Sequence, residues 1–222
     1  MPDWKTMLIP VLLRWIHVIA GIAWIGHLWY FNLVQAHAEK ALDAGQKKIV
    51  VPHNRGRAFF WFRWGSMVTM LSGLLYLVWE QFVATNLNFA HWFDKIATNN
   101  VWITMGALFG LMMWYNVWFV IWPRQKQIIA GIATGNKPAD FDALVARAGR
   151  ASRVNTYLSV PMLFGMSARS HFSAGDMTET LIWCGGFVAL GLFVAHLFLT
   201  KIGPKAGTEF AAMLPPPAPP AK

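Results

Sequence analysis

Long apolar stretches alternate with short polar stretches along this 222-residue chain. Four of the apolar stretches are near the 20 residues that an α-helix needs to cross a bilayer. The predicted helices are roughly Leu8–Val34, Phe62–Ala84, Val101–Trp122 and Glu179–Thr200. The third is expected to end at Pro123, because proline cannot continue a helix.

A fifth apolar stretch, Val154–Ser170, is shorter and contains Asn155, Pro161 and Arg169. It is predicted to be a tilted and kinked span, with a re-entrant element as the alternative. The fold class is therefore an all-α integral membrane protein, a bundle of about five transmembrane helices over residues 1–203. The Pro-rich stretch 204–222 is expected to be a disordered tail.

The composition supports a membrane protein. Hydrophobic residues make up 56% of the chain and charged residues only 13%, whereas soluble domains carry about 25% charged residues. The formal net charge is +9, which in a soluble protein would suggest nucleic acid. Here the basic residues lie between the apolar stretches, which indicates contact with anionic lipids and no nucleic-acid partner.

The basic residues also predict the orientation. They are concentrated in Gln35–Trp61, Arg124–Arg153 and the tail, whereas Thr85–Asn100 is nearly neutral. The first two are expected to be loops, with a short amphipathic helix over Ala139–Gly149. Five spans with the N-terminus outside place all three basic segments in the cytoplasm, as the positive-inside rule requires. The expected location is the bacterial inner membrane.

The single cysteine, Cys184, excludes an intrachain disulfide and a cysteine-ligated zinc or iron–sulfur site. No Cys-x-x-Cys-His motif is present, so no c-type haem is expected on this chain. The phosphate-binding, serine-hydrolase and zinc-protease motifs are absent as well.

The candidate chemistry lies in ionisable residues within the apolar stretches, because charges at membrane depth are costly and mark functional sites. One layer contains Arg14 and His17 in the first span, with His171 just beyond the fourth segment. Glu80, near the end of the second span, is a candidate ion-pair partner for Arg14. A propionate role for Arg14 is the alternative.

The second layer contains His27, Arg63 and His196. Counted from the starts of their spans at Leu8 and Glu179, the two histidines agree in height to within about 3 Å at 1.5 Å per residue. Histidines at one height on two spans suit the two axial positions of b-type haem, and arginine suits its propionates. Both layers are therefore candidate haem sites, with His17, His27, His171 and His196 as candidate iron ligands. The alternative is that each histidine hydrogen-bonds a neighbouring helix.

Two rows of mainly small or polar residues are expected to pack helices together. One row is Ser66, Thr69, Gly73, Tyr76 and Glu80 on the second span. The other is Gly185, Ala189 and His196 on the last span. A water-filled proton or ion pathway is a weaker interpretation, because Glu80 is the only carboxylate well inside a span.

Four blocks of sequence resemble the membrane domain of bacterial membrane-bound urate hydroxylases. They are residues 14–26 (RWIHVIAGIAWIG) with 30–32 (YFN), residues 62–65 (FRWG) with 72–74 (SGL), residues 116–123 (NVWFVIWP) and residues 166–172 (MSARSHF). The first is the most specific. Within it, the pattern His-Val-x-Ala-x-x-x-Trp from His17 to Trp24 is similar to small haem-binding membrane proteins of the protoporphyrinogen-oxidase type.

Both resemblances imply redox work in the membrane. Urate hydroxylases typically join this domain to a C-terminal cytochrome c, whereas this chain is expected to end in its Pro-rich tail. A separate cytochrome c or a quinone is therefore the expected electron acceptor. The sequence thus predicts a haem b electron-transfer protein. The alternatives are an accessory subunit of a respiratory or photosynthetic complex, and an oxidoreductase that oxidises urate.

Overall fold

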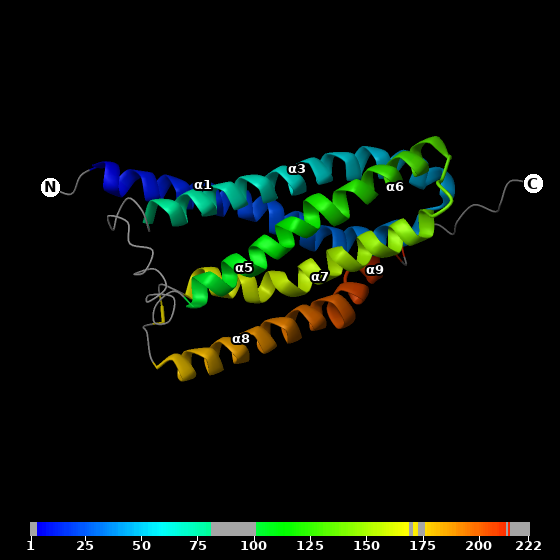
Figure 1. Cartoon of the computed structure of the whole chain (residues 1–222). Coiled ribbons are helices and arrows are strands. Elements are labelled where there is room, and N and C mark those ends of the chain that lie inside the picture. The colour runs from blue at the N-terminus through cyan, green and yellow to red at the C-terminus, as the bar shows by residue number, and fades with distance from the viewer. Residues whose placement is uncertain (1–3, 81–100, 169–170, 173–175, 212, 214–222) are drawn as a thin grey trace, which may run out of the picture.

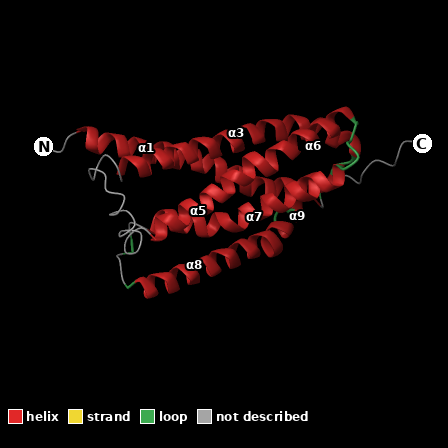
Figure 2. Ribbon diagram, viewed as in Figure 1, coloured by secondary structure: helices red, strands yellow, loops and turns green. Residues whose placement is uncertain are grey.

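The computed structural model describes residues 4–80, 101–168, 171–172, 176–211 and 213. Within these ranges the chain forms long helices that run up and down one elongated bundle (Figure 1), and Figure 2 draws no strand among them. The structure confirms the prediction of an all-α bundle. The stretch from residue 214 and the predicted loop Thr85–Asn100 lie outside the described residues.

Five long helical rods make up the described bundle, and several contain a π-helical segment, written η. Rod 1 is α1 (Trp4–Trp29), η1 (Tyr30–Gln35), α2 (Ala36–Ala38) and the 3₁₀ turn η2 (Glu39–Ala41). Rod 2 is α3 (Ala44–Val78), and rod 3 is α5 (Val101–Tyr115), η5 (Asn116–Ile121) and α6 (Trp122–Thr134). Rod 4 is α7 (Phe141–Ala168), and rod 5 is α8 (Met177–Leu197), η6 (Phe198–Ile202) and the 3₁₀ turn η7 (Gly203–Lys205). The short α9 (Thr208–Ala211) follows.

Three of the described rods are long and apolar enough to cross a bilayer: Met7–Ala41, Val101–Thr134 and Thr178–Lys205. Rods 2 and 4 lie alongside them (Figure 1). Each of these two rods is basic in its first half and uncharged in its second half. The uncharged halves are residues 64–78 of rod 2 and residues 154–168 of rod 4. The chain is thus a membrane protein with a helix count near the predicted five.

The antiparallel course of the rods separates the charges. Basic residues are concentrated around the connections from rod 1 to rod 2 and from rod 3 to rod 4, and both connections lie on the right of Figure 1. We call this the basic end. The N-terminus and the starts of α5 and α8 lie at the opposite end, which we call the N-terminal end.

The predicted loops at the basic end are wrong, because most of their residues are helical. Rod 1 continues to Ala41, and α3 begins at Ala44 after a capping box. In it, Asp43 Oδ1 accepts a hydrogen bond from the Gln46 backbone N–H at 2.8 Å, and Gln46 Oε1 accepts one from the Asp43 N–H at 3.0 Å. This reciprocal pair starts a new helix within one turn, so the basic side chains lie on helices and not on a flexible loop.

Pro123 does not end its helix, which corrects a second prediction. It lies in the first turn of α6, where a missing backbone N–H and a fixed φ near −65° are tolerated. The helix continues to Thr134 and stops at Gly135, whose φ of 80° is left-handed and suits glycine. The predicted amphipathic helix Ala139–Gly149 is the beginning of α7.

Glycines allow close approach where rods cross. An added Cβ at Gly65 would lie 3.1 Å from the Trp24 backbone N, and one at Gly165 would lie 2.8 Å from the Trp102 carbonyl O. A cluster of large buried residues fills the space between rods 1 to 4. Its members include Trp24, Leu28, Phe59, Phe62, Met113, Val117 and Met162. Rods 1 to 4 therefore form a tightly packed unit around these crossings.

Helix α8 packs on α7 through a different face from the predicted one. Gly185, Ala189 and His196 are exposed. The packed face contains Cys184 and Gly191, where an added Cβ would lie 2.9 Å from Pro161 Cδ. A small residue is needed where two helices touch, and Gly191 rather than Gly185 meets the neighbouring helix. The row on α3 is predicted correctly, since Ser66, Thr69 and Tyr76 are buried.

Candidate functional site

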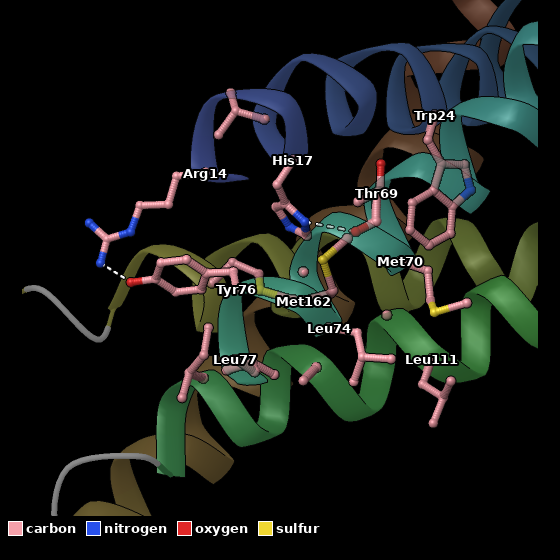
Figure 3. Close-up of a pocket in the computed structure, with 16 residues that line it drawn as sticks. Arg14, His17, Trp24, Thr69, Met70, Leu74, Tyr76, Leu77, Leu111 and Met162 are labelled. Atoms are coloured by element: carbon pink, nitrogen blue, oxygen red, sulfur yellow. Dashed lines mark hydrogen bonds between the residues drawn. The ribbon is translucent and has the colours of Figure 1, made fainter. Parts of the chain in front are cut away.

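A cavity of about 590 Å³ lies between α1, α3, α5 and α7, toward the N-terminal end. We call it the His17 pocket. Its walls are mainly apolar, and its polar groups are few (Figure 3). The lining includes Arg14, His17 and Trp24 of α1, Thr69, Gly73 and Tyr76 of α3, Ala107 and Gly110 of α5, and Met162 and Met166 of α7. Its size and character are those of sites that enclose a cofactor or another small molecule.

The imidazole of His17 reaches from α1 toward α3 (Figure 3), where its Nδ1 lies 2.8 Å from the carbonyl oxygen of Thr69. A carbonyl can only accept, so Nδ1 carries the proton and donates. In a neutral ring this leaves Nε2 with its lone pair, the arrangement that metal-ligating histidines use. No hydrogen bond to Nε2 is found among the described residues.

Gly73 provides the space for this ring. An added Cβ at position 73 would lie 2.8 Å from His17 Cε1 and 3.0 Å from Nδ1. Real Cβ atoms do not approach so closely, so any larger residue would push the imidazole away from Thr69. Gly73 and Thr69 therefore position His17 together, one by leaving room and one by accepting its proton.

Two polar features lie at opposite sides of the pocket. The Trp24 side chain is 2% exposed, and its indole N–H is buried with no hydrogen-bond partner among the described residues. Arg14 donates to the Tyr76 hydroxyl, which donates to Glu80, and the Arg14–Glu80 ion pair measures 3.4 Å. The Arg14 side chain is 64% exposed, so the expected ion pair exists but lies at the surface of the fold.

His171, the predicted partner of His17, is not brought to the pocket. It lies in the turn after α7, is exposed, and uses its backbone N–H to bond the Ala168 carbonyl at 2.9 Å. Of the first predicted layer, Arg14, His17 and His171, only Arg14 and His17 line the pocket.

His27 and His196, the other predicted pair, lie at similar heights but have different neighbours. The ring centres of Trp29 and Phe198 lie 5.7 Å apart. Trp29 is two residues after His27, and Phe198 is two residues after His196, so this contact places the two histidines at similar heights. Trp29 also bonds Ser159 of α7, and His27 lies about 200° from Trp29 around the helix axis. His27 Nδ1 bonds the Ala23 carbonyl of its own helix at 2.6 Å.

His196 faces outward from α8. Its Nδ1 lies 2.9 Å from the Tyr157 hydroxyl, and the residue is exposed. The structure does not bring His196 and His27 together as one axial pair. His196 has the bond to a neighbouring helix that was the alternative interpretation, whereas His27 bonds a carbonyl of its own helix.

Arg63 lies among tryptophans. Its guanidinium carbon is 4.0 Å from the centre of the Trp122 ring and 5.4 Å from that of Trp118. Cation–π contact of this kind partly offsets the cost of placing an arginine in an apolar region. The propionate role expected for Arg63 stays a prediction.

Sequence reasoning missed Met162 and Met166 of α7, which line the same pocket as His17. They are four residues apart and thus on one helix face, and that spacing within an uncharged stretch was the available signal. Within the described residues, no group of three or more histidine, cysteine, aspartate or glutamate side chains could hold a metal ion. A metal here needs to bring most of its own ligands, as haem iron does.

The comparisons with known proteins agree with the resemblance noted in the sequence. The family described as "Urate oxidase N-terminal" matches residues 3–49 and 77–214. The intervening segment contains most of the α3 wall of the His17 pocket, whereas the α1, α5 and α7 walls lie in matched residues. No curated protein and no solved structure matches the chain. Since the family covers most of its length, this membrane protein belongs to the urate oxidase N-terminal family.

Proposed function

We propose that this chain is a redox protein of the membrane, in which the His17 pocket holds b-type haem and His17 is an axial ligand. The observation that carries the proposal is the hydrogen bond from His17 Nδ1 to the Thr69 carbonyl, at 2.8 Å. This bond directs the lone pair to Nε2 and fixes the ring in a mainly apolar cavity.

The donors around the pocket suit such a group. Met162 and Met166 of α7 line the pocket, and a methionine sulfur could help to hold haem iron. Arg14, in the same lining, offers a guanidinium for a propionate. Haem bound here would supply one-electron transfer, and the protein would set its potential through these ligands and through burial.

Each residue would have a defined task. Thr69 holds the His17 proton on Nδ1, and Gly73 keeps space for the ring. The apolar walls of α3 and α5 exclude water, which strengthens each polar interaction inside. The Arg14–Tyr76–Glu80 chain of hydrogen bonds lies on the side nearest the N-terminal end.

An optical spectrum of the purified full-length protein tests the proposal. We expect a Soret band and, on reduction, a sharp α band of b type. His17→Ala should abolish both bands. His196→Ala, a matched loss of an exposed histidine outside the pocket, should keep them. A protein without pigment when purified from cells that make haem would refute the proposal. Its co-purification with other membrane proteins would then indicate an accessory subunit.

A quinone site is a second candidate, and the buried indole of Trp24 favours it. This N–H has no partner among the described residues, and a quinone carbonyl accepts such a bond. A pigment-free protein that binds a short-chain quinone, and loses this binding in Trp24→Phe, would support this candidate. Phenylalanine keeps the ring and removes the donor, so retained binding in that variant would exclude a role for the N–H.

Membership of the urate oxidase N-terminal family supports urate as a substrate to test. The assay is urate-dependent reduction of added cytochrome c or quinone by the protein in membranes. Activity that His17→Ala abolishes would connect oxidation to the pocket. Pigment without activity would leave electron transfer as the function and remove urate as the donor.

We further propose that the chain lies in the bacterial inner membrane with its basic end in the cytoplasm, as the positive-inside rule predicts. The native Cys184 is buried, so new exposed cysteines can report the orientation. A membrane-impermeant maleimide should label His171→Cys in intact cells and should label Lys48→Cys only after lysis. The reverse pattern would overturn this orientation.

A further inference from the structure

A second cavity, of about 490 Å³, lies at the basic end between rods 1 to 4. We call it the basic pocket. Buried aromatic and aliphatic residues form its floor, among them Phe59 and Ile121. Charged and amide side chains contributed by rods 1 to 4 and by the connection between α6 and α7 form its rim. The pocket was not foreseen, because the sequence predicted loops in this region.

Five cationic side chains line this one cavity: Lys40, Lys47, Arg55, Lys137 and Arg153. Among the described residues that line it, the only carboxylate is that of Glu39, which is 9% exposed. The positive-inside rule explains why basic residues are at this end, but it does not explain why five of them, from rod 1, α3, α7 and the connection between α6 and α7, line one cavity. Convergence of like charges is unfavourable unless an anion neutralises them.

The single carboxylate is already engaged. Arg55 Nε donates to Glu39 Oε1 at 2.9 Å, a second bond joins Arg55 Nη2 to Glu39 Oε2, and both side chains are mostly buried. No ion pair involves Lys40, Lys47, Lys137 or Arg153 among the described residues. Four cations therefore remain around the cavity without a carboxylate.

The rim also carries a buried amide. Gln35 is 4% exposed and donates its Nε2 hydrogen to Glu39, and its Oε1 has no hydrogen-bond partner among the described residues. An acceptor in this position suits a ligand that presents a hydroxyl beside its negative charge. A phosphate group combines both, since it offers several acceptor oxygens to cations and a P–OH when singly protonated.

From this arrangement we infer that the basic pocket binds a phosphate group, either the headgroup of an anionic lipid or a free phosphate. Lysine binds phosphate as a compact point charge, and arginine through its planar pair of donors. The Glu39–Arg55 pair holds rod 1 against α3 and so shapes the cavity, while Lys47 and Arg153 supply charge from α3 and α7. This site is separate from the His17 pocket and does not depend on a redox function.

The sequence offers matched variants for the test. Lys47 and Arg153 line the pocket, whereas Lys48 and Arg150 lie on the same two helices, are exposed, and do not line it. The double variant Lys47→Gln with Arg153→Gln removes two charges from the pocket. The control, Lys48→Gln with Arg150→Gln, removes two charges from the same end of the protein.

The full-length protein is placed in nanodiscs of phosphatidylcholine alone, and inorganic phosphate is titrated by calorimetry at fixed ionic strength. A second arm adds phosphatidylglycerol to the discs and measures the melting temperature. We expect saturable phosphate binding, stabilisation by phosphatidylglycerol, or both. A response to free phosphate identifies a soluble ligand, and a response only to the lipid identifies a headgroup.

The variants decide whether the pocket is responsible. The pocket variant should weaken the response about tenfold, because two charge-assisted contacts are lost, and the control should stay within about twofold of the unchanged protein. Equal weakening in both variants would overturn the proposal and indicate general charge attraction. Absence of any saturable response to either probe would overturn it as well.

Discussion

The His17 pocket and the basic pocket are made by the same four rods, yet they suit opposite kinds of ligand. The first has apolar walls, one histidine and two methionines, and the second has five cations around an apolar floor. The difference arises because α3 and α7 each change from basic to uncharged halfway along. One helical scaffold can therefore present a membrane-like cavity at one end and a water-facing anion site at the other.

Disrupting the scaffold should have the largest effect. Gly165→Leu inserts a side chain where even a Cβ would lie 2.8 Å from the Trp102 carbonyl. We expect a loss of about 3 kcal/mol in stability, the upper part of the overpacking range. Gly185→Leu is the control, because nothing lies within 4 Å of its Cβ position. Thermal unfolding in detergent followed by circular dichroism compares them, and equal stability would contradict the close crossing.

Removing the buried carboxylate should lower stability and change the basic pocket, but leave the His17 pocket unaltered. Glu39→Gln leaves Arg55 without its partner, and we expect a loss of about 2 kcal/mol in stability. Phosphate affinity should rise about threefold, because the pocket loses its single negative charge. Adding Arg55→Met should restore most of the stability. An unchanged melting temperature in Glu39→Gln would mean that the Glu39–Arg55 pair does not stabilise the fold. The control Glu209→Gln should leave the melting temperature unchanged.

A smaller change should affect only the His17 pocket. Gly73→Ala places a methyl group 2.8 Å from His17 Cε1 and should displace the ring from the Thr69 carbonyl. We expect about 1 kcal/mol of destabilisation and a shifted or weakened absorption band, with phosphate binding at the basic pocket unchanged. Gly186→Ala is the control, because its Cβ position is open. An identical spectrum in Gly73→Ala would contradict a role for His17 in binding the pigment.

The smallest effect is expected at the surface ion pair. Arg14→Gln removes a side chain that is 64% exposed from its contact with Glu80, and exposed pairs contribute less than about 1 kcal/mol. The melting temperature of the variant should hardly change. If Arg14 pairs with a haem propionate, however, the variant should shift the reduction potential of the pigment. A redox titration separates these roles, because a purely structural arginine would leave the potential unchanged.

The prediction of the fold from sequence was correct where hydrophobicity dominates. The apolar stretches around His17, Gly110 and Leu190 became helices, because backbone groups in lipid have to bond within their own segment. The prediction failed for the basic stretches, which were taken as loops. Lysine and arginine are good helix formers in water. A basic stretch therefore indicates where a span leaves the apolar region, but it does not indicate where the helix ends.

The candidate site was predicted only in part. His17 and Arg14 line a pocket as expected, since an apolar helix shows ionisable residues plainly. His27 and His196 were paired by height alone, but a helical residue has a direction as well as a height. That direction depends on which neighbour each helix packs against. The hydrophobic periodicity within α1 or α8 does not predict that neighbour.

The sequence by itself determined that this chain is an apolar helical bundle of the membrane with its positive charge gathered at one end. These properties follow from local composition, because each span must satisfy its own backbone and each charge must remain near water. Only the tertiary structure decided that His17 stands against Thr69 and Gly73, and that five cations meet in one cavity. Those juxtapositions join residues on different helices, and they are fixed by close packing at a few small residues such as Gly65 and Gly165.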